Sequence, residues 1–293
     1  MSQQQRALVV STGKNAAWVS IDGEESPRLA QLRRMRGRRS MPVPGDVAHV
    51  RVLEDGRTVV ERTEPRRFTL ERRTIGGRTK TMAANIDLLT VVIALAHPPP
   101  RLATLDQLLA FAELEEIPAA VIFTKPDLAD PERSAALIEL YRQLEYPAVR
   151  VNAKAGENVD ALRRLIEGRH AMLVGNSGVG KSTIFRALGG DSHVGEVSRH
   201  GLGRQTTTAG RLYRFGEGFL IDSPGIAEFG LGKVDAATLT ECFREMPAPA
   251  RQCRFTDCTH VAEPECAVIR AVGAGAIAES RYASYCKILT EPS

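Results

Sequence analysis

One segment of the chain has the residue types and spacing of a phosphate-binding loop. Residues 175–182 read GNSGVGKS, which fits the pattern G-x-x-x-x-G-K-[ST], after the apolar run AMLV and before KSTIFRAL. In that strand-to-helix context backbone N–H groups surround phosphate oxygens, a lysine approaches the β- and γ-phosphates, and a hydroxyl binds Mg²⁺. We predict a nucleoside triphosphate site in which Lys181 and Ser182 act in catalysis. The predicted contacts are Gly175, Asn176, Ser177, Gly178, Val179, Gly180, Lys181, Ser182 and Thr183.

A second segment is a candidate for recognising the base. Thr124, Lys125, Pro126 and Asp127 follow the apolar run AAVIF. A carboxylate at the fourth position can accept hydrogen bonds from the ring N–H and the exocyclic amine of guanine, whereas adenine would leave a buried carboxylate unpaired. Four residues are a weak match alone, and TKPD is also compatible with a plain strand-to-turn junction.

Further segments favour the guanine interpretation. Asn152, Ala153 and Lys154 follow the run AVRV and are typical of the loop whose backbone N–H meets guanine O6. The segment DSPG follows GFLI, where Asp222 would hold Mg²⁺ through water and the Gly225 N–H would meet the γ-phosphate. We therefore predict GTP and GDP as ligands, together with Mg²⁺.

A threonine-rich segment lies between the phosphate loop and DSPG. Residues 204–208 read RQTTT. A threonine in this position can sense the γ-phosphate through Mg²⁺. We assign this role to Thr207, and Thr206 and Thr208 are the alternatives.

The order of these segments is unusual. Ordinary regulatory GTPases place the phosphate elements before the base-reading ones, whereas here the order is base-reading segments, phosphate loop, threonine segment and DSPG, or G4-G5-G1-G2-G3. We predict a circularly permuted domain, which a parallel sheet tolerates when the original termini lie close together. Two rivals remain. One is an ATP-dependent kinase or ATPase with the same loop, and the other is a zinc-containing RNA-binding module that senses nucleotide without turnover.

The C-terminal part of the sequence contains a candidate metal centre. Cys253, Cys258, His260 and Cys266 place three thiols and one imidazole within fourteen residues. Three cysteines and one histidine form a closed tetrahedral set for one structural Zn²⁺, and buried free cysteines are the alternative. The following tail helix carries several side chains suited either to RNA contact or to packing against the nucleotide domain. These are Arg281, Tyr282, Tyr285 and Lys287.

Alternating strands and helices are expected to position the nucleotide segments. We predict buried strands at DLLTVVIALA, AAVIFTK, AVRVNAK, HAMLVGN and GFLIDSPG, and helices at LDQLLAFAELEE, PERSAALIELYRQL, NVDALRRLIE and KSTIFRAL. This alternation predicts an α/β domain with a parallel sheet and helices on its faces. Ligands of such sheets bind at the carboxyl ends of the strands.

The N-terminal part is basic and rich in short β-like runs. The runs ALVVS, AAWVSI, VAHVRVL and TVVER are separated by turn residues, which predicts a small barrel of the OB type, with an SH3-like barrel as the alternative. Residues 1–80 contain 17 Lys and Arg against 9 Asp and Glu, and residues 33–39 read RRMRGRR. Guanidinium groups suit phosphate oxygens, so this stretch is predicted to face nucleic acid, the alternative being a solvated surface loop.

Composition limits the cellular location. The longest apolar run, LLTVVIALA at residues 88–96, is far shorter than the roughly 20 residues of a membrane span. The N-terminal MSQQQR has no apolar secretory region. We expect a cytoplasmic protein without membrane contact, in which cysteines serve as metal ligands or buried thiols.

In combination these features resemble one family, the ribosome small-subunit-dependent GTPases, known as RsgA or YjeQ. The resemblance covers nearly the whole chain: the basic barrel, AANID at residues 83–87, TKPD, GNSGVGKST, the threonine triplet, DSPG and the zinc pattern. It implies an OB-fold RNA-binding domain at 1–66, a permuted GTPase domain at 67–230 and a helical zinc-binding domain at 231–293. It also implies a GTP hydrolase that assists late maturation of the 30S ribosomal subunit, binds 16S rRNA and leaves on hydrolysis. We expect a monomer that does not bind DNA.

Two positions concern the hydrolytic step. Members of the family often carry histidine directly before the threonine triplet, where this chain has Gln205, which puts a catalytic role of that side chain in doubt. Ile226 follows DSPG, where signalling GTPases place a water-orienting glutamine. Because an aliphatic side chain cannot orient water, intrinsic hydrolysis is expected to be slow and to rise when a partner, the 30S subunit, supplies the missing group.

Overall fold

The computed structural model describes residues 4–24, 26–32, 41–73, 79–189, 211–215, 218–222, 231 and 234–290. The chain forms two compact units. The first comprises Met1–Leu88, Arg163–Leu173 and Phe185–Gly225, and the second comprises Leu89–Leu162, Val174–Ile184 and Ile226–Ser293. The domain boundaries expected after residues 66 and 230 stay a prediction.

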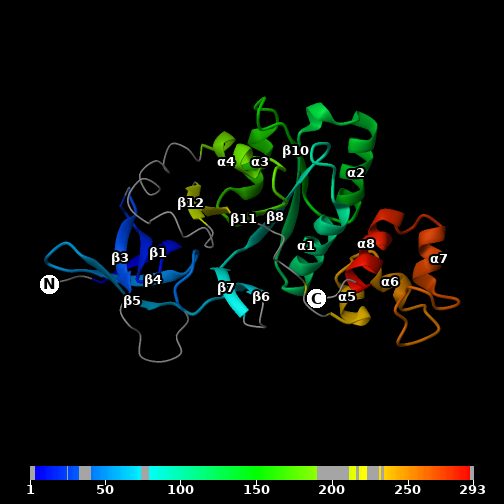
Figure 1. Ribbon diagram of the computed structural model, residues 1–293, viewed down its shortest axis with the longest axis horizontal. Helices are drawn as coiled ribbons and strands as arrows, with labels where there is room; N and C mark the ends of the chain where they lie inside the picture. The colour runs from blue at the N-terminus through cyan, green and yellow to red at the C-terminus, as the bar shows by residue number, and fades with distance from the viewer. Residues whose placement is uncertain are drawn as a thin grey trace. The chain divides into compact units, whose positions relative to one another are not determined.

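The N-terminal strands close into a five-stranded barrel, drawn in blue in Figure 1. The strands are β1 (Gln4–Thr12), β2 (Ala16–Ile21), β3 (Arg28–Leu32), β4 (Val47–Val52) and β5 (Thr58–Thr63), in the order β1-β2-β3-β5-β4. Alternate residues of β2 point inward, so that Ala17, Val19 and Ile21 are fully buried. β3 and β5 pair in parallel and complete the closure, which removes exposed strand edges. The expected OB-type barrel is confirmed.

A hairpin and a buried asparagine follow the barrel. β6 (Thr69–Arg73) pairs antiparallel with β7 (Thr79–Ala84). The Asn85 amide donates to the Gly45 carbonyl at 2.9 Å, and its oxygen accepts from the Arg67 N–H at 2.9 Å. A side chain at Gly45 would come within 2.0 Å of the Ala84 carbonyl oxygen, so the turn before β4 requires glycine. These bonds fix where the chain leaves the barrel.

The central sheet has six strands in the order β10-β9-β8-β11-β13-β12. β8 (Leu88–Ala94), β9 (Ala119–Thr124) and β10 (Ala148–Val151) are mutually parallel, as are β11 (His170–Val174) and β13 (Gly218–Asp222), while β12 (Arg211–Phe215) is antiparallel to β13. Every residue of β8 and β9 is buried, as expected for strands covered on both faces. The predicted α/β domain is confirmed.

Helices follow the strands of this sheet. They are α1 (Leu102–Leu114), the short η1 (Pro126–Leu128), α2 (Pro131–Gln143), α3 (Val159–Ile166) and α4 (Lys181–Ala187). The four α-helices match the predicted helical stretches, and η1 was not predicted. The Asp130 carboxylate accepts from the Arg133 N–H at 2.8 Å and caps α2, which begins with proline. Among the described helices, none is long and apolar enough to cross a bilayer.

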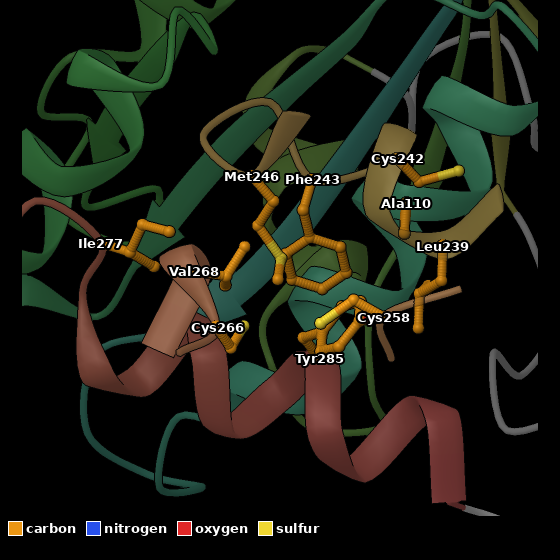
Figure 2. Packing of buried hydrophobic residues seen from close by; sticks show 10 residues of the cluster. All are labelled: Ala110, Leu239, Cys242, Phe243, Met246, Cys258, Cys266, Val268, Ile277 and Tyr285. Atoms are coloured by element: carbon orange, nitrogen blue, oxygen red, sulfur yellow. The ribbon is translucent and has the colours of Figure 1, made fainter. Parts of the chain in front are cut away.

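The C-terminal part is helical and shares a core with α1. It contains α5 (Ala236–Glu241), α6 (Pro247–Ala250), α7 (Ala267–Gly273) and α8 (Glu279–Thr290). Figure 2 shows Phe243 and Tyr285 at the centre of this core, with ring centroids 5.6 Å apart and planes at 88°. Ala110 of α1 belongs to the same buried cluster. The helical module is therefore built onto α1.

Candidate nucleotide site and metal centre

The backbone path of the phosphate loop depends on glycine. The loop connects the end of β11 at Val174 to the start of α4 at Lys181. A side chain at Gly175 would come within 2.2 Å of the Val92 carbonyl oxygen, because the loop passes directly over β8. Gly178 and Gly180 have φ angles of +77° and +103°, which strain other residues.

The predicted base-reading segment lies directly against this loop. The Thr124 hydroxyl donates to the Val179 carbonyl at 2.5 Å, across 55 positions of sequence. The Lys125 ammonium donates to the Gly178 carbonyl at 2.7 Å and also to the His97 carbonyl. TKPD and GNSGVGKS are thus in direct contact. Asp127 follows with an exposed side chain.

The NAK segment starts beside TKPD. Val151, the last residue of β10, pairs with Thr124, the last residue of β9, so both loops leave the same edge of the sheet. Asn152 and Glu157 exchange backbone hydrogen bonds of 3.2 and 3.0 Å, and the Asn152 side-chain oxygen accepts from the Ala155 N–H at 3.2 Å. The loop that contains Ala153 and Lys154 is therefore closed on itself, with its position fixed relative to TKPD.

Two residues predicted to act in catalysis, Lys181 and Ser182, lie at the start of α4. The Lys181 ammonium donates to the carbonyls of Gly175 and Asn176. The lysine is thus folded across the loop, where the β- and γ-phosphates of a nucleotide are expected. Ser182 is exposed at the start of α4, and a hydroxyl oxygen is a ligand type that Mg²⁺ accepts.

Part of the predicted site lies outside the described residues. This applies to the threonine segment with Thr207, to Gly225, to Gln205 and Ile226, and to the arginine-rich stretch at 33–39. Asp222 is the last residue of β13 and pairs with Leu173 of β11. Leu173 is one residue before the end of β11, where the phosphate loop begins. The strand register therefore brings the backbone of Asp222 to the end of β11.

The four predicted metal ligands converge. Their ligand atoms lie within 4.8 Å of one another. The Cys253 and Cys266 sulfurs are 3.8 Å apart, and the His260 Nδ1 lies 3.6 and 3.5 Å from them. A zinc tetrahedron with metal–sulfur bonds of about 2.3 Å and a metal–nitrogen bond of about 2.0 Å has edges of about 3.5 to 3.8 Å. The side chains, including Cys258, fit one Zn²⁺.

The ligand loop is held by groups that the sequence analysis missed. The Glu263 carboxylate accepts from the Thr259 hydroxyl and N–H at 2.5 and 2.7 Å and from two further backbone N–H groups. Hydrogen bonds from the Thr259 hydroxyl and from the backbone N–H groups of Thr259, Glu263 and Ala262 lower the pKa of Glu263 to about 2. The Tyr282 hydroxyl donates to the His260 carbonyl at 2.8 Å, and that of Tyr285 donates to the Thr259 carbonyl at 3.0 Å. Helix α8 therefore supports the ligand loop.

Burial affects two of the ligands in opposite ways: it favours the ligand form of His260 and disfavours the thiolate of Cys258. Burial lowers the pKa of His260, which keeps the imidazole neutral and able to bind a metal ion. Burial raises the pKa of the Cys258 thiol to about 12. The thiolate form of Cys258 at neutral pH is therefore linked to metal binding.

An ionic cluster joins α8 to α1. The Arg281 side chain is 1% exposed and donates to the carboxylates of Asp106, at 2.6 Å, and Glu245, at 2.6 and 3.1 Å. The Tyr141 hydroxyl also donates to Asp106, at 2.8 Å. The Arg281 guanidinium lies 4.4 Å from the centre of the Phe243 ring. Of the two alternatives for the tail helix, packing against the nucleotide domain is confirmed for Arg281.

A second contact lies at the other end of α1. The Arg244 guanidinium lies 3.9 Å from the centre of the Tyr146 ring and donates to the Glu113 carboxylate at 2.8 Å. The Tyr146 hydroxyl donates to the same carboxylate at 3.0 Å. We call the C-terminal helical part that carries the four candidate ligands, α5 to α8, the zinc module. It is thus attached near both ends of α1.

The fold and the order of its loops define a P-loop GTPase whose domain is circularly permuted. The sequence pattern of the RsgA GTPase family matches residues 63–232. The chain belongs to the RsgA GTPase family and is a GTP-hydrolysing enzyme.

Several known proteins are similar over nearly the whole chain. The "Small ribosomal subunit biogenesis GTPase RsgA" of Azotobacter vinelandii is 37% identical over 99% of this chain and 86% of its own, and that of Pseudomonas aeruginosa is 39% identical over 95% and 84%. The crystal structure of YjeQ from Thermotoga maritima has a TM-score of 0.78 and 31% identity, covering 98% of each chain. YloQ, a circularly permuted GTPase, has a TM-score of 0.74 at 22% identity, over 99% of this chain and 97% of that one, which supports the fold alone.

Proposed function

We propose that this protein is a late assembly factor of the 30S ribosomal subunit, which binds 16S rRNA in its GTP form and is released by hydrolysis. The contact of Thr124 and Lys125 with the phosphate loop carries the GTPase part of the proposal. The ribosomal part is supported by relatives whose name is small ribosomal subunit biogenesis GTPase and by the basic N-terminal 80 residues. The protein would act in the cytoplasm as a monomer, divided at about residues 66 and 230.

The roles of the nucleotide-binding residues follow from their positions. Asp127 would accept from the guanine ring N–H and exocyclic amine, and the backbone of Asn152 to Lys154 would donate to O6. Lys181 would exchange its loop carbonyls for phosphate oxygens. Ser182 and Asp222 would hold Mg²⁺, which neutralises charge on the phosphate oxygens when bound. Thr207 and the Gly225 N–H would contact the γ-phosphate side.

Hydrolysis is expected to depend on the ribosomal partner. The chain has Gln205 and Ile226 at the two positions expected to lie near the hydrolytic step, and neither is the group usual at its position. The 30S subunit would therefore supply or position the group that orients water. Phosphate release from GTP should be slow with the protein alone and faster when 30S subunits are added. The Lys181→Ala variant, which should not hydrolyse GTP, gives the background rate. Equal rates with and without subunits would contradict this assignment.

The zinc module would transmit the nucleotide state. DSPG is followed after a few residues by the zinc module, and Leu231 already packs on its core. GTP would favour the geometry that grips the subunit, and hydrolysis would release it. A long flexible insertion after Gly232 should leave zinc binding intact but make the affinity for 30S subunits equal in GDP and in a GTP analogue. A difference between the two nucleotides as large as in the wild type would contradict the coupling.

A further inference from the structure

The Thr124 hydroxyl lies between two protein carbonyls at the end of β9. The side chain is 3% exposed, and its oxygen lies 2.5 Å from the Val179 carbonyl oxygen and 3.3 Å from that of Ile93. A hydroxyl carries one proton, and a carbonyl oxygen can only accept. The proton of Thr124 is therefore committed to the protein, and the shorter distance assigns it to Val179 in the phosphate loop.

Guanine has one more hydrogen-bonding group than Asp127 and the loop at 152–154 would contact. Asp127 would take the two donors of the base, and the loop at 152–154 would take O6. The ring nitrogen N7 is an acceptor and requires a donor. Thr124 cannot supply one, and the neighbouring Lys125 ammonium directs two of its three N–H donors to the carbonyls of Gly178 and His97, which hold it against the phosphate loop.

We infer that Thr124 is a positioning residue for the phosphate loop and that the pocket binds guanine without a hydrogen bond to N7. This inference rests on the proposed guanine pocket. It limits base recognition to Asp127 and to the loop at 152–154. An asparagine at position 124 has two N–H donors, so it could hold Val179 and donate to N7 at the same time.

The direct test compares GDP with 7-deaza-GDP, in which a C–H replaces N7. The wild type is expected to bind both with the same affinity in calorimetric titrations. Thr124→Asn should bind GDP about 2- to 10-fold more tightly than 7-deaza-GDP, the range for one net hydrogen bond. A wild-type preference for GDP as large as that of Thr124→Asn overturns the inference. Titration with inosine diphosphate, which lacks the exocyclic amine, tests the proposed pocket separately: it should bind more weakly than GDP.

The positioning role has its own test. Thr124→Val keeps the size of the side chain but leaves the Val179 carbonyl without its donor, so GDP and 7-deaza-GDP should weaken by the same factor. Thr124→Ser should restore both affinities. Thr240→Val is the matched control, because Thr240 is equally buried and donates to the Ala236 carbonyl at 2.7 Å within the zinc module. Wild-type affinity in Thr124→Val, or no recovery in Thr124→Ser, counts against the role. The wild-type comparison of GDP with 7-deaza-GDP needs no variant to fold.

Discussion

Replacement of Arg281 by methionine is expected to destabilise the zinc module strongly. Among the described residues, the guanidinium is the cation paired with the Asp106 carboxylate, at 2.6 Å, and it also binds Glu245. Asp106 is fully buried, and its Oδ2 has no hydrogen-bond partner among the residues that the structure describes. Methionine fills similar space but leaves a buried carboxylate without its cation. Breaking such a pair from one side costs about 3 to 5 kcal/mol, against a total stability of about 5 to 15 kcal/mol.

The same variant has a defined pH dependence. Burial raises the pKa of Asp106 above its usual value, and Arg281 opposes that rise. Loss of the arginine therefore raises the pKa further. A raised folded-state pKa means that the folded protein binds the proton more tightly than the unfolded chain. The deficit of Arg281→Met should be largest at pH 8 and shrink as the pH falls and Asp106 is protonated. Adding Asp106→Asn should recover part of the loss at pH 8.

Urea unfolding of the zinc-loaded protein, followed by far-ultraviolet circular dichroism, measures the loss. The single tryptophan, Trp18, lies in β2 of the barrel and reports barrel unfolding separately by fluorescence. Arg254→Met is the matched control, because its ion pair with Glu265 is mostly exposed and should contribute at most about 1 kcal/mol. A loss below about 1 kcal/mol at pH 8, or a loss that does not shrink on acidification, would refute this reasoning.

Two further substitutions test the metal centre and the phosphate loop. Glu263→Gln should lower zinc affinity about 10- to 100-fold in a chelator competition, because the carboxylate orients the ligand loop, while Glu265→Gln should leave it unchanged. An unaltered zinc affinity in Glu263→Gln contradicts the orienting role. Gly175→Ala should abolish GDP binding, because its side chain would come within 2.2 Å of the Val92 carbonyl oxygen. Gly56→Ala, whose added side chain meets no atom within 4 Å, should keep wild-type GDP affinity, and retained binding in Gly175→Ala would show that the loop can shift.

Segments with local signals could be predicted from the sequence. β8 and β9 are continuous apolar runs because both faces are covered, and the phosphate loop is marked by glycines that its backbone path requires. β3 was missed. Its residues Arg28, Leu29 and Gln31 are exposed, so the run RLAQL has little alternation, and the strand is held by pairing with β2 and β5. Pairing between distant segments leaves no signal in a five-residue window.

Local sequence patterns could not predict most of the residues that support the site, because these residues contact partners far away in the sequence. Asp106 and Arg281 are separated by 175 positions, and nothing around Arg281 distinguishes a buried arginine from one that faces RNA. Glu263 had a usable signal, because an acid between two ligands of a metal loop can accept from the backbone N–H groups of that loop. The assignment of Asp127 to guanine stays a prediction. The structure adds that TKPD touches the phosphate loop.

The most direct measurement of the central claim is a titration of wild type and Asp127→Asn with GDP and with xanthosine diphosphate. If TKPD and GNSGVGKS form one guanine pocket, the variant loses GDP and gains xanthosine diphosphate, whose added carbonyl accepts where the amine of guanine donated. Both affinities should also require Lys181. A variant that binds GDP as tightly as the wild type does would contradict the shared pocket.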